Sequence, residues 1–301
     1  LKEQGYDVIG VTMQIWQDEV QTQMEENSGC CGLSAVDDAR RVAEQLDIPY
    51  YVMNFKNEFR KYVMDYFIEE YRHGRTPNPC IACNRYLKWE ALLQRSMEIG
   101  ADYIATGHYA QVEQLSNGRY SIKNSLSAHK DQTYVLYNLT QEQLSRTLMP
   151  VGAFEKDEIR HIAEKIGLMV ANKKDSQDIC FIPDNDYAGF LEKEGGNDLP
   201  LEGNFVLQNG EIVGRHLGVY HYTIGQRKGL NLALGKPVFV NHIDVIRNEV
   251  VVGDNADVFQ TSLQCNQVNY MADEIWNEDK IYLGKIRYSH QGTPCKVRRI
   301  D

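Results

Sequence analysis

Short apolar runs alternate with helical repeats through the first half of the chain. Three runs are rich in β-branched and aromatic residues, which is typical of buried parallel strands, and they span residues 6–13, 50–55 and 103–106. Apolar residues elsewhere recur at intervals of three or four, which indicates amphipathic helices over 34–46, 59–67 and 87–99, with further helix in 141–194. Strands that alternate with helices predict an α/β domain with a mostly parallel sheet.

The pattern changes near residue 198, where strand-like runs replace helical ones. Asn209-Gly210 separates two such runs and is a strong signal for a β-hairpin, and Arg247-Asn248 is placed in the same way. Residues 280–300 alternate again without a helical period. We therefore predict three domains: an α/β domain over 1–197, a small β-rich domain over 198–260, and the start of a β-barrel-like domain over 261–301.

Composition changes this picture little, but charge changes it more. The chain has 301 residues, 43% of them hydrophobic, and no apolar run reaches the roughly 18 residues that span a membrane. The formal charge of -10 argues against a nucleic-acid partner. However, lysines and arginines gather in three windows, at 71–89, 214–247 and 280–299, and the first and last of these contain no acid. Such windows indicate either a surface for a polyanion or ordinary solvated charge.

Seven cysteines, an odd number, in a chain without a signal-peptide pattern indicate reduced thiols in a cytoplasmic protein. Cys80 and Cys83 form a Cys-x-x-Cys motif within the acid-free window 71–89, where positive neighbours favour the reactive thiolate. Half of a zinc site, a redox dithiol and buried structural cysteines all remain open for this pair. Cys180 follows two lysines in a polar segment and is either reactive or only packed.

Polar residues also follow the third predicted strand, in Ala105-Thr-Gly-His-Tyr109. Open parallel sheets bind ligands where strands end, and Gly107 lets a ligand approach the backbone closely. His108 is either part of such a site or an ordinary hydrogen-bonded loop residue. The polar stretches 129–132 and 222–229 suit the binding of an anion.

Taken together and in order, these motifs resemble the bacterial tRNA-specific 2-thiouridylase family. The matching segments are 29–31, the helix from Ser34, 74–84, 105–109, 130–132, 175–181, 222–230 and 285–288. The resemblance implies a nucleotide-binding α/β domain of the PP-loop, or adenine nucleotide alpha hydrolase-like, class. A small β-rich central domain and a C-terminal β-barrel domain, incomplete here, would follow it.

The resemblance also implies an enzyme, a tRNA-uridine 2-sulfurtransferase that uses ATP with Mg²⁺. It would replace the 2-oxygen of the wobble uridine in tRNAs for lysine, glutamate and glutamine. ATP would adenylate that oxygen, and sulfur would come from a cysteine persulfide. Cys180 would carry the persulfide, and Cys83 would release its sulfur and close a transient disulfide with Cys180. The partners implied are tRNA and a sulfur donor, either a cysteine desulfurase or a relay protein, with no membrane.

Motif matching assigns further site residues. Met13 and Gly107 would contact ATP. The target base would be contacted by Asn78, Pro79 and Cys80. Contacts with the rest of the tRNA would come from His108, Lys130, Asp131, Gln132, Arg287 and Tyr288.

Three departures from the family pattern matter. Residues 1–5 read as the last turn of a helix before Gly5, and the family's phosphate-binding loop should lie just before Leu1, so we expect termini beyond those printed. The chain also stops at Asp301, before the barrel closes. Many members have Asp where this chain has Cys80.

The third thiol raises an alternative, an iron–sulfur cluster held by Cys80, Cys83 and Cys180. A non-catalytic tRNA-binding protein and a dithiol oxidoreductase are further alternatives.

Overall fold

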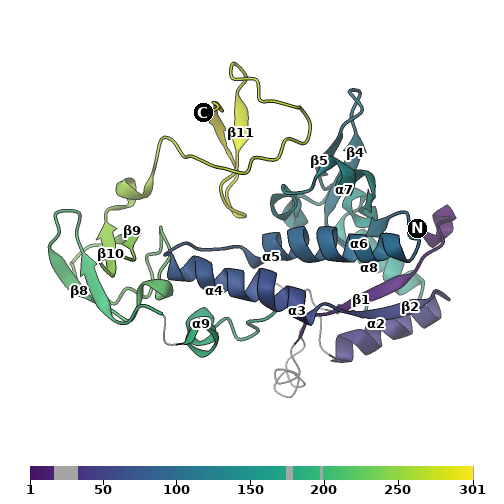
Figure 1. The fold of residues 1–301 in the computed structure, drawn as a ribbon, viewed down its shortest axis with the longest axis horizontal. Coiled ribbons are helices and arrows are strands. Elements are labelled where there is room, and N and C mark those ends of the chain that lie inside the picture. Colours follow the sequence, from purple (N-terminus) through teal and green to yellow (C-terminus); the bar gives the residue numbers. More distant parts are fainter. Residues whose placement is uncertain (17–32, 174–178, 197–198, 301) are drawn as a thin grey trace. The chain divides into compact units, whose positions relative to one another are not determined.

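The computed structural model describes residues 1–16, 33–173, 179–196 and 199–300 (Figure 1). These residues form two compact units. Unit 1 draws on three segments of the chain, Leu1–Glu58, Cys80–Asp175 and Gln267–Asp301, and unit 2 draws on two, Phe59–Pro79 and Ser176–Asn266. Within the described residues, no helix combines the length and the apolar character that crossing a membrane requires.

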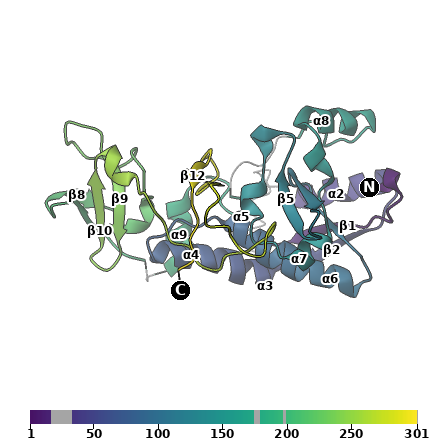
Figure 2. The ribbon, with the colours of Figure 1, turned by 90° about the horizontal axis from the view of Figure 1, so that it is seen from above.

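Unit 1 begins with a parallel strand pair. Strands β1 (Gly10–Gln14) and β2 (Tyr50–Asn54) pair in register from Gly10 opposite Tyr50, and helix α2 (Leu33–Gln45) lies alongside both (Figures 1 and 2). The Tyr50 hydroxyl donates to Thr12 Oγ1 at 2.7 Å, which ties the two strands together. The predicted strands are confirmed, although the first begins at Gly10 rather than near Tyr6, because its ladder begins where the Gly10 amide donates to the Pro49 carbonyl.

Unit 1 contains a second parallel pair, β3 (Ile104–Ala105) with β6 (Thr147–Leu148). The prediction that 141–194 is helical is therefore wrong at β6. The helices there are α7 (Gln141–Ser145), α8 (Lys156–Lys165) and α9 (Tyr187–Gly195), the last in unit 2. Thr147 enters the core, where its hydroxyl accepts a hydrogen bond from the Trp89 indole at 2.7 Å, and this tertiary contact overrides helix propensity.

An antiparallel hairpin that we did not predict from the sequence completes this part of unit 1. Strand β4 (Ala110–Gln114) pairs with β5 (Tyr120–Asn124). Its apolar side packs onto a core that contains Trp89, Ile104, Ala110, Leu136, Leu139 and Leu144.

Two long helical stretches cover residues 56–72 and 79–98. The first consists of α3 (Lys56–Phe59), η2 (Arg60–Met64) and α4 (Asp65–Arg72), and the second of α5 (Pro79–Ala82), η3 (Cys83–Leu92) and α6 (Leu93–Glu98). The segments η2 and η3 have π-helical hydrogen bonding. The predicted helices are confirmed, but the second begins eight residues before Leu87, because Pro79 is suited to the first helical position.

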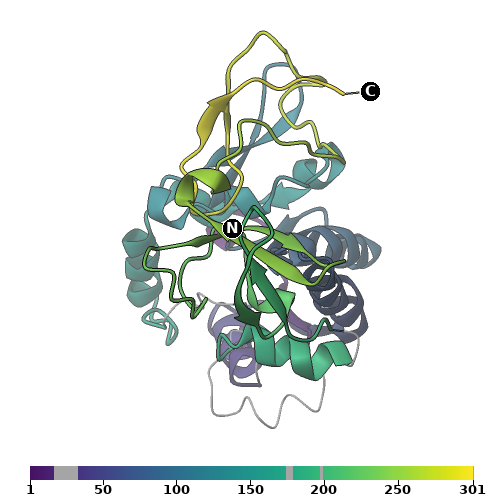
Figure 3. The same ribbon diagram turned by 90° about the vertical axis from the view of Figure 1, so that its left-hand side faces the viewer.

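Unit 2 contains a four-stranded sheet of order β8-β7-β10-β9, which Figure 3 brings to the front. Its strands are β7 (Gly203–Val206), β8 (Ile212–His216), β9 (Phe239–Asp244) and β10 (Glu249–Gly253). Both predicted hairpins are confirmed, and β7 and β10 form the parallel centre of the sheet. The sheet core consists of Phe205, Val219, Tyr222, Leu230, Val238, Val240, Ile243, Val250 and Val252.

The C-terminal segment belongs to unit 1 and forms an antiparallel pair, β11 (Tyr282–Gly284) with β12 (Thr293–Cys295). Asn269 attaches it to the core of unit 1 by donating to the carbonyls of Tyr137 and Leu139, both at 2.7 Å. Short 3₁₀ turns complete the fold, at η1 (Lys2–Gln4), η4 (Ala128–Lys130), η5 (Thr133–Val135), η6 (Pro150–Ala153), η8 (Val219–His221) and η9 (Asn255–Val258). The domain boundaries at 197 and 260 stay predictions.

Candidate functional site

The loop after β3 holds a buried histidine. His108 is 8% exposed, and its Nδ1 lies 2.8 Å from Thr106 Oγ1, while its Nε2 lies 3.4 Å from Lys88 Nζ. Burial, with the Lys88 charge as a smaller cause, lowers the pKa of His108 to about 3. The imidazole is therefore neutral at physiological pH. Its burial agrees with one of the two alternatives left open by the sequence, namely that His108 is an ordinary hydrogen-bonded loop residue.

Gly107 follows one parallel strand, and Met13 lies near the end of another. Gly107 comes two residues after β3 and is exposed, and a Cβ at this position would meet nothing within 4 Å. Met13 is partly buried near the carboxyl end of β1, opposite Met53. Carboxyl ends of parallel strands are where open α/β sheets bind ligands, so both positions suit contact with a nucleotide.

The Cys-x-x-Cys motif opens the second long helix. Pro79 is buried and Asn78 is partly buried, whereas Cys80 is exposed and Cys83 is intermediate in exposure. The two cysteines are three residues apart on a helix, so their side chains lie on neighbouring positions of one face. The motif thus lies in the first turn of a helix, where it presents one accessible thiol and one partly covered thiol.

Cys180 lies in unit 2 and is also intermediate in exposure. The next residue, Phe181, is 5% exposed and packs edge-on against Phe59 and Phe67 at centroid distances of 5.6 and 5.5 Å. This aromatic cluster anchors the backbone that carries the Cys180 thiol. The preceding motif residues 175–177 and the pair Cys30-Cys31 lie outside the described residues, and the meeting of Cys83 with Cys180 stays a prediction.

The segment Lys130 to Gln132 is tied to the loop after β3. The Gln132 side-chain oxygen accepts from the Tyr109 amide, and the Gln132 amide donates to the Tyr109 carbonyl, both at 2.9 Å. Asp131 is 9% exposed, and its carboxylate accepts from the amides of Ser125 and Thr133. The structure therefore brings two of the sequence motifs together, with Asp131 and Gln132 turned inward to hold their loops.

The C-terminal motif lies against the same part of unit 1. The Tyr134 hydroxyl donates to the Ile286 carbonyl at 3.3 Å, and the Tyr134 and Tyr288 rings lie 6.3 Å apart. Lys285 Nζ lies 5.5 Å from the Tyr288 ring centroid and 5.9 Å from that of Tyr134. Arg287 and Tyr288 are exposed. Tyr134, four residues after Lys130, thus connects the predicted contacts at 130–132 with those at 287–288.

The three basic windows differ in how their charges are paired. In window 214–247, three of the five cations are in ion pairs, Arg215–Glu202, Lys236–Asp254 and Arg247–Asp244, whereas the exposed Arg227 and Lys228 form none with another described residue. Window 71–89 is divided between the two units, and Arg75 forms a close pair with Glu70 at 2.6 Å. The six cations of window 280–299 are all exposed, and none is in an ion pair with another described residue. This last window is therefore the best candidate for a polyanion contact.

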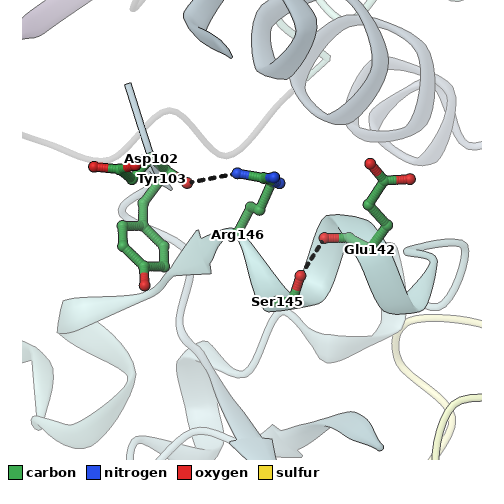
Figure 4. Close-up of a pocket in the computed structure, with 5 residues that line it drawn as sticks. All are labelled: Asp102, Tyr103, Glu142, Ser145 and Arg146. Carbon is green, nitrogen blue, oxygen red and sulfur yellow. Dashed lines mark hydrogen bonds between the residues drawn. The ribbon is translucent and has the colours of Figure 1, made fainter. Parts of the chain in front are cut away.

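A pocket lies at the other end of the β3–β6 pair (Figure 4). It is lined by Asp102, Tyr103, Glu142, Ser145 and Arg146. These residues precede β3 and β6, whereas Gly107 and His108 follow β3. Ligands bind at the carboxyl ends of parallel strands, so this pocket lies at the wrong end of the pair for a nucleotide. In the part of the chain that the structure describes, no three His, Cys, Asp or Glu side chains are grouped to hold a metal ion.

Comparison with known proteins assigns the family. The family model described as the tRNA methyl transferase HUP domain matches residues 1–184, and the one described as the tRNA methyl transferase PRC-barrel domain matches residues 188–254. A protein of Lachnoclostridium phytofermentans named tRNA-specific 2-thiouridylase MnmA is 64% identical over the whole chain, which covers 84% of that relative. The chain belongs to the tRNA-specific 2-thiouridylase family.

Further 2-thiouridylases named MnmA extend the comparison. Relatives from Clostridium perfringens strain 13 and Clostridioides difficile strain 630 are 57% and 51% identical over the whole chain, which covers 83% and 82% of them. The predicted family, the enzyme class and the order of a nucleotide-binding domain followed by a small barrel-like domain are confirmed. The individual site residues stay predictions.

From the sequence, Lys88 was identified only as a cation of the basic window 71–89, and Tyr134 was not identified. Lys88 is four residues after Asn84 on η3, and its ammonium donates to the Asn84 side-chain oxygen at 2.9 Å. This helical spacing is the signal that was available for the pair, because residues four apart on a helix are neighbours. No sequence signal pointed to Tyr134, whose contact is with a segment more than 150 residues away.

Proposed function

We propose that this 2-thiouridylase replaces the 2-oxygen of the wobble uridine with sulfur in tRNAs for lysine, glutamate and glutamine. Membership of the family already shows that the protein is an ATP-using enzyme of tRNA uridine thiolation. The observation that carries the proposal is 64% identity across all 301 residues to a protein named for tRNA 2-thiolation. We place this activity in the cytoplasm.

In the first step, the uridine 2-oxygen attacks the α-phosphorus of ATP, and pyrophosphate leaves. The base then carries AMP on that oxygen, which is a much better leaving group than oxide. Gly107 supports the nucleotide part of this step, because its open backbone leaves room for a ligand at the end of β3. Met13 would contact the same nucleotide. Mg²⁺ would accompany ATP, and the described residues supply no grouped carboxylates to hold it alone.

In the second step, the Cys83 thiolate attacks the inner sulfur of a Cys180 persulfide. A Cys83–Cys180 disulfide forms, and the outer sulfur leaves as hydrosulfide. Hydrosulfide attacks C2 of the adenylated uridine, AMP leaves, and the proton passes to solvent. A dithiol reductant then reopens the disulfide, and a cysteine desulfurase or a sulfur-relay protein reloads Cys180. The intermediate exposure of both thiols suits groups that must meet a partner and yet be shielded from bulk water.

The tRNA contacts are proposed on two sets of residues. The target base would be contacted at the start of the helical stretch 79–98, called the cysteine helix below, by Asn78, Pro79 and Cys80. Lys130, Arg287 and Tyr288 would contact the rest of the tRNA, with His108, Asp131 and Gln132 holding the loops that present them. Arg287 is exposed, and the exposed Lys285 has its ammonium 5.5 Å from the centroid of the Tyr288 ring, an arrangement that suits phosphate and base contacts.

The activity test uses the full-length protein, unmodified tRNA, ATP and a persulfide donor, with thiolated tRNA measured on a mercury gel. Both Cys83→Ser and Cys180→Ser are expected to lose thiolation. Cys265→Ser, at an exposed cysteine outside the proposed site, is the matched control and should retain it. A wild-type protein that binds tRNA without thiolating it would instead indicate a non-catalytic binder. Disulfide reduction that needs neither ATP nor tRNA would indicate an oxidoreductase.

Cys80 separates the persulfide mechanism from the iron–sulfur alternative. Cys80 and Cys83 lie one turn apart on a helix, which is compatible with shared ligation. We expect anaerobically purified protein to be colourless and free of iron, and Cys80→Ser to keep most of its thiolation. Stoichiometric iron with a visible absorption band, together with loss of activity in Cys80→Ser, would reverse this conclusion.

A further inference from the structure

A lysine on the cysteine helix lies against the loop after β3. Lys88 is five residues after Cys83 on η3, and its Nζ donates to Asn84 Oδ1 at 2.9 Å. The same Nζ lies 3.4 Å from Nε2 of His108. A single ammonium group therefore connects the helix that carries the proposed thiol with the loop that carries Gly107.

Both neutral partners of this ammonium are fixed in orientation. The Asn84 side-chain nitrogen donates to the Val135 carbonyl at 2.9 Å, so its oxygen must face Lys88. Lysine can only donate, so His108 Nε2 accepts, and the ring proton resides on Nδ1 and is donated to Thr106 Oγ1 at 2.8 Å. The low pKa of His108 agrees with this neutral form. Asn84 and His108 are 2% and 8% exposed, so both are held by packing.

The charge of Lys88 has no counterion among the residues that the structure describes. Its ammonium has three protons and two neutral acceptors, and it forms no ion pair with a carboxylate among the described residues. The side chain is only partly exposed. A partly buried cation with neutral partners alone is less stable than one with an anion beside it. Because Asn84 and His108 already orient the Lys88 ammonium, binding an anion would cost little further side-chain entropy of Lys88.

We propose that Lys88 binds a phosphate group of a substrate and that Asn84 and His108 position its ammonium for this contact. The proposal rests on the proposed function, which brings two phosphate-bearing substrates, ATP and tRNA. A phosphate oxygen from either source matches a lysine that acts as a point charge. His108 follows Gly107 beyond the carboxyl end of β3, the edge at which open α/β sheets bind ligands.

The test compares Lys88→Met with Arg85→Met in the full-length protein. Arg85 lies on the same helix, with a 3.9 Å pair to the exposed Glu90 and a guanidinium carbon 5.0 Å from the centroid of the Tyr86 ring. Neither contact involves the loop after β3, so Arg85 is the matched control. The two readouts are the KM for ATP in the thiolation assay and the Kd of unmodified tRNA measured without ATP. Lys88→Met should weaken one of these constants by about tenfold to a hundredfold, the range for a charged hydrogen bond, while Arg85→Met changes each by less than about threefold.

The pattern of the change identifies the source of the phosphate. A higher KM for ATP with an unchanged Kd for tRNA assigns the contact to ATP. A weaker Kd for tRNA, with a salt slope reduced by about one, assigns it to a backbone phosphate. Either pattern supports the proposal.

The positioning role of His108 has its own comparison. His108→Gln can place an acceptor near the position of Nε2, whereas His108→Leu cannot. We expect His108→Leu to weaken the same constant as Lys88→Met by about tenfold, and His108→Gln to stay within about threefold of wild type. A purely structural histidine would lower the melting temperature in both variants without selecting one substrate constant.

Unchanged constants in a folded Lys88→Met protein would overturn the proposal, and so would a fall in kcat alone. If Lys88→Met does not fold, Lys88→Gln replaces it, because glutamine keeps a donor near Asn84 and removes the charge. Failure of the proposed function is distinguishable, since it appears as wild-type protein that thiolates no tRNA. The Kd of tRNA still tests Lys88 in that event.

Discussion

His108 carries an imidazole that stays neutral because burial lowers its pKa to about 3. In the unfolded chain the same group has an ordinary pKa near 6.5. Between these values the unfolded state binds a proton that the folded state excludes. The contribution of His108 to stability is therefore complete above about pH 6.5 and decreases as the pH falls below it.

We predict that lowering the pH from 7.5 to 5.5 costs about 1.4 kcal/mol of unfolding free energy through His108. Urea unfolding at the two pH values measures the loss, and His108→Gln should reduce it by about that amount. His129→Gln, at an exposed histidine on η4, is the control substitution. Identical pH dependence in wild type and His108→Gln would contradict the neutral, buried imidazole.

Motif positions predicted which loops matter better than they predicted which way each side chain points. Residues 105–109 and 130–132 were both identified from the sequence, and the structure places them in contact through Tyr109 and Gln132. The inward orientation of Asp131 and Gln132 depends on amides supplied by other residues, such as Ser125 and Tyr109. Hydrogen bonds of this kind have no signature in residue type or spacing.

Elements with a strong internal signal were predicted well, and elements defined by partners were not. The hairpin at Asn209-Gly210 and the helix over 56–72 follow from turn chemistry and apolar period. Strand β3 lies within the predicted run 103–106, whereas its two-residue partner β6 is too short to show any period and was mistaken for helix. The hairpin β4–β5 is an exception, because it was missed although Asn117-Gly118 lies at its turn, the same dipeptide that predicted the hairpin at Asn209-Gly210.

Packing of η6 against β4 leads to a prediction at the scale of elements. A Cβ on Gly152 would lie 1.8 Å from the Ala110 carbonyl oxygen, a backbone atom that cannot move without distorting β4. Gly152→Ala should therefore lower the unfolding free energy by about 1–3 kcal/mol. Chemical denaturation measures this loss.

Gly107→Ala is the matched control for this substitution, because a Cβ there meets nothing within 4 Å. It should leave stability unchanged within about 0.5 kcal/mol. Equal stability of the two variants would show that η6 and β4 do not approach closely. The same Gly107→Ala protein also tests the nucleotide contact, since its new methyl group would occupy the open space expected to hold ATP.

Charge at the scale of the molecule can be interpreted only after its ion pairs are known. The sequence places basic windows at 71–89, 214–247 and 280–299, but it does not show which cations have acidic partners. Three of the five cations in window 214–247 are paired with acids from their own unit, such as Glu202 and Asp254. The net charge of -10 conceals one window of exposed cations beside Tyr134 and Tyr288.

We predict that Lys285→Ala with Arg287→Ala lowers the salt dependence of tRNA binding. If each side chain contacts one phosphate, the slope of log Kd against log salt decreases by roughly 1.4 to 1.8. Filter binding between 50 and 200 mM salt, about the range over which such slopes are read, provides the measurement. Lys236→Ala, whose ammonium is paired with Asp254 at 2.7 Å, is the control. Equal slopes in the double variant and the control would place the tRNA elsewhere.

Unit 1 is assembled from three separate stretches of chain, and this has a consequence for synthesis on the ribosome. Unit 2 has all its residues once position 266 has been made, whereas unit 1 still waits for residues 267–301. Until Asn269 emerges, the carbonyls of Tyr137 and Leu139 lack the donor that they have in the finished fold. We therefore expect unit 2 to finish folding first, and unit 1 to be completed only after β11 and β12 have been made.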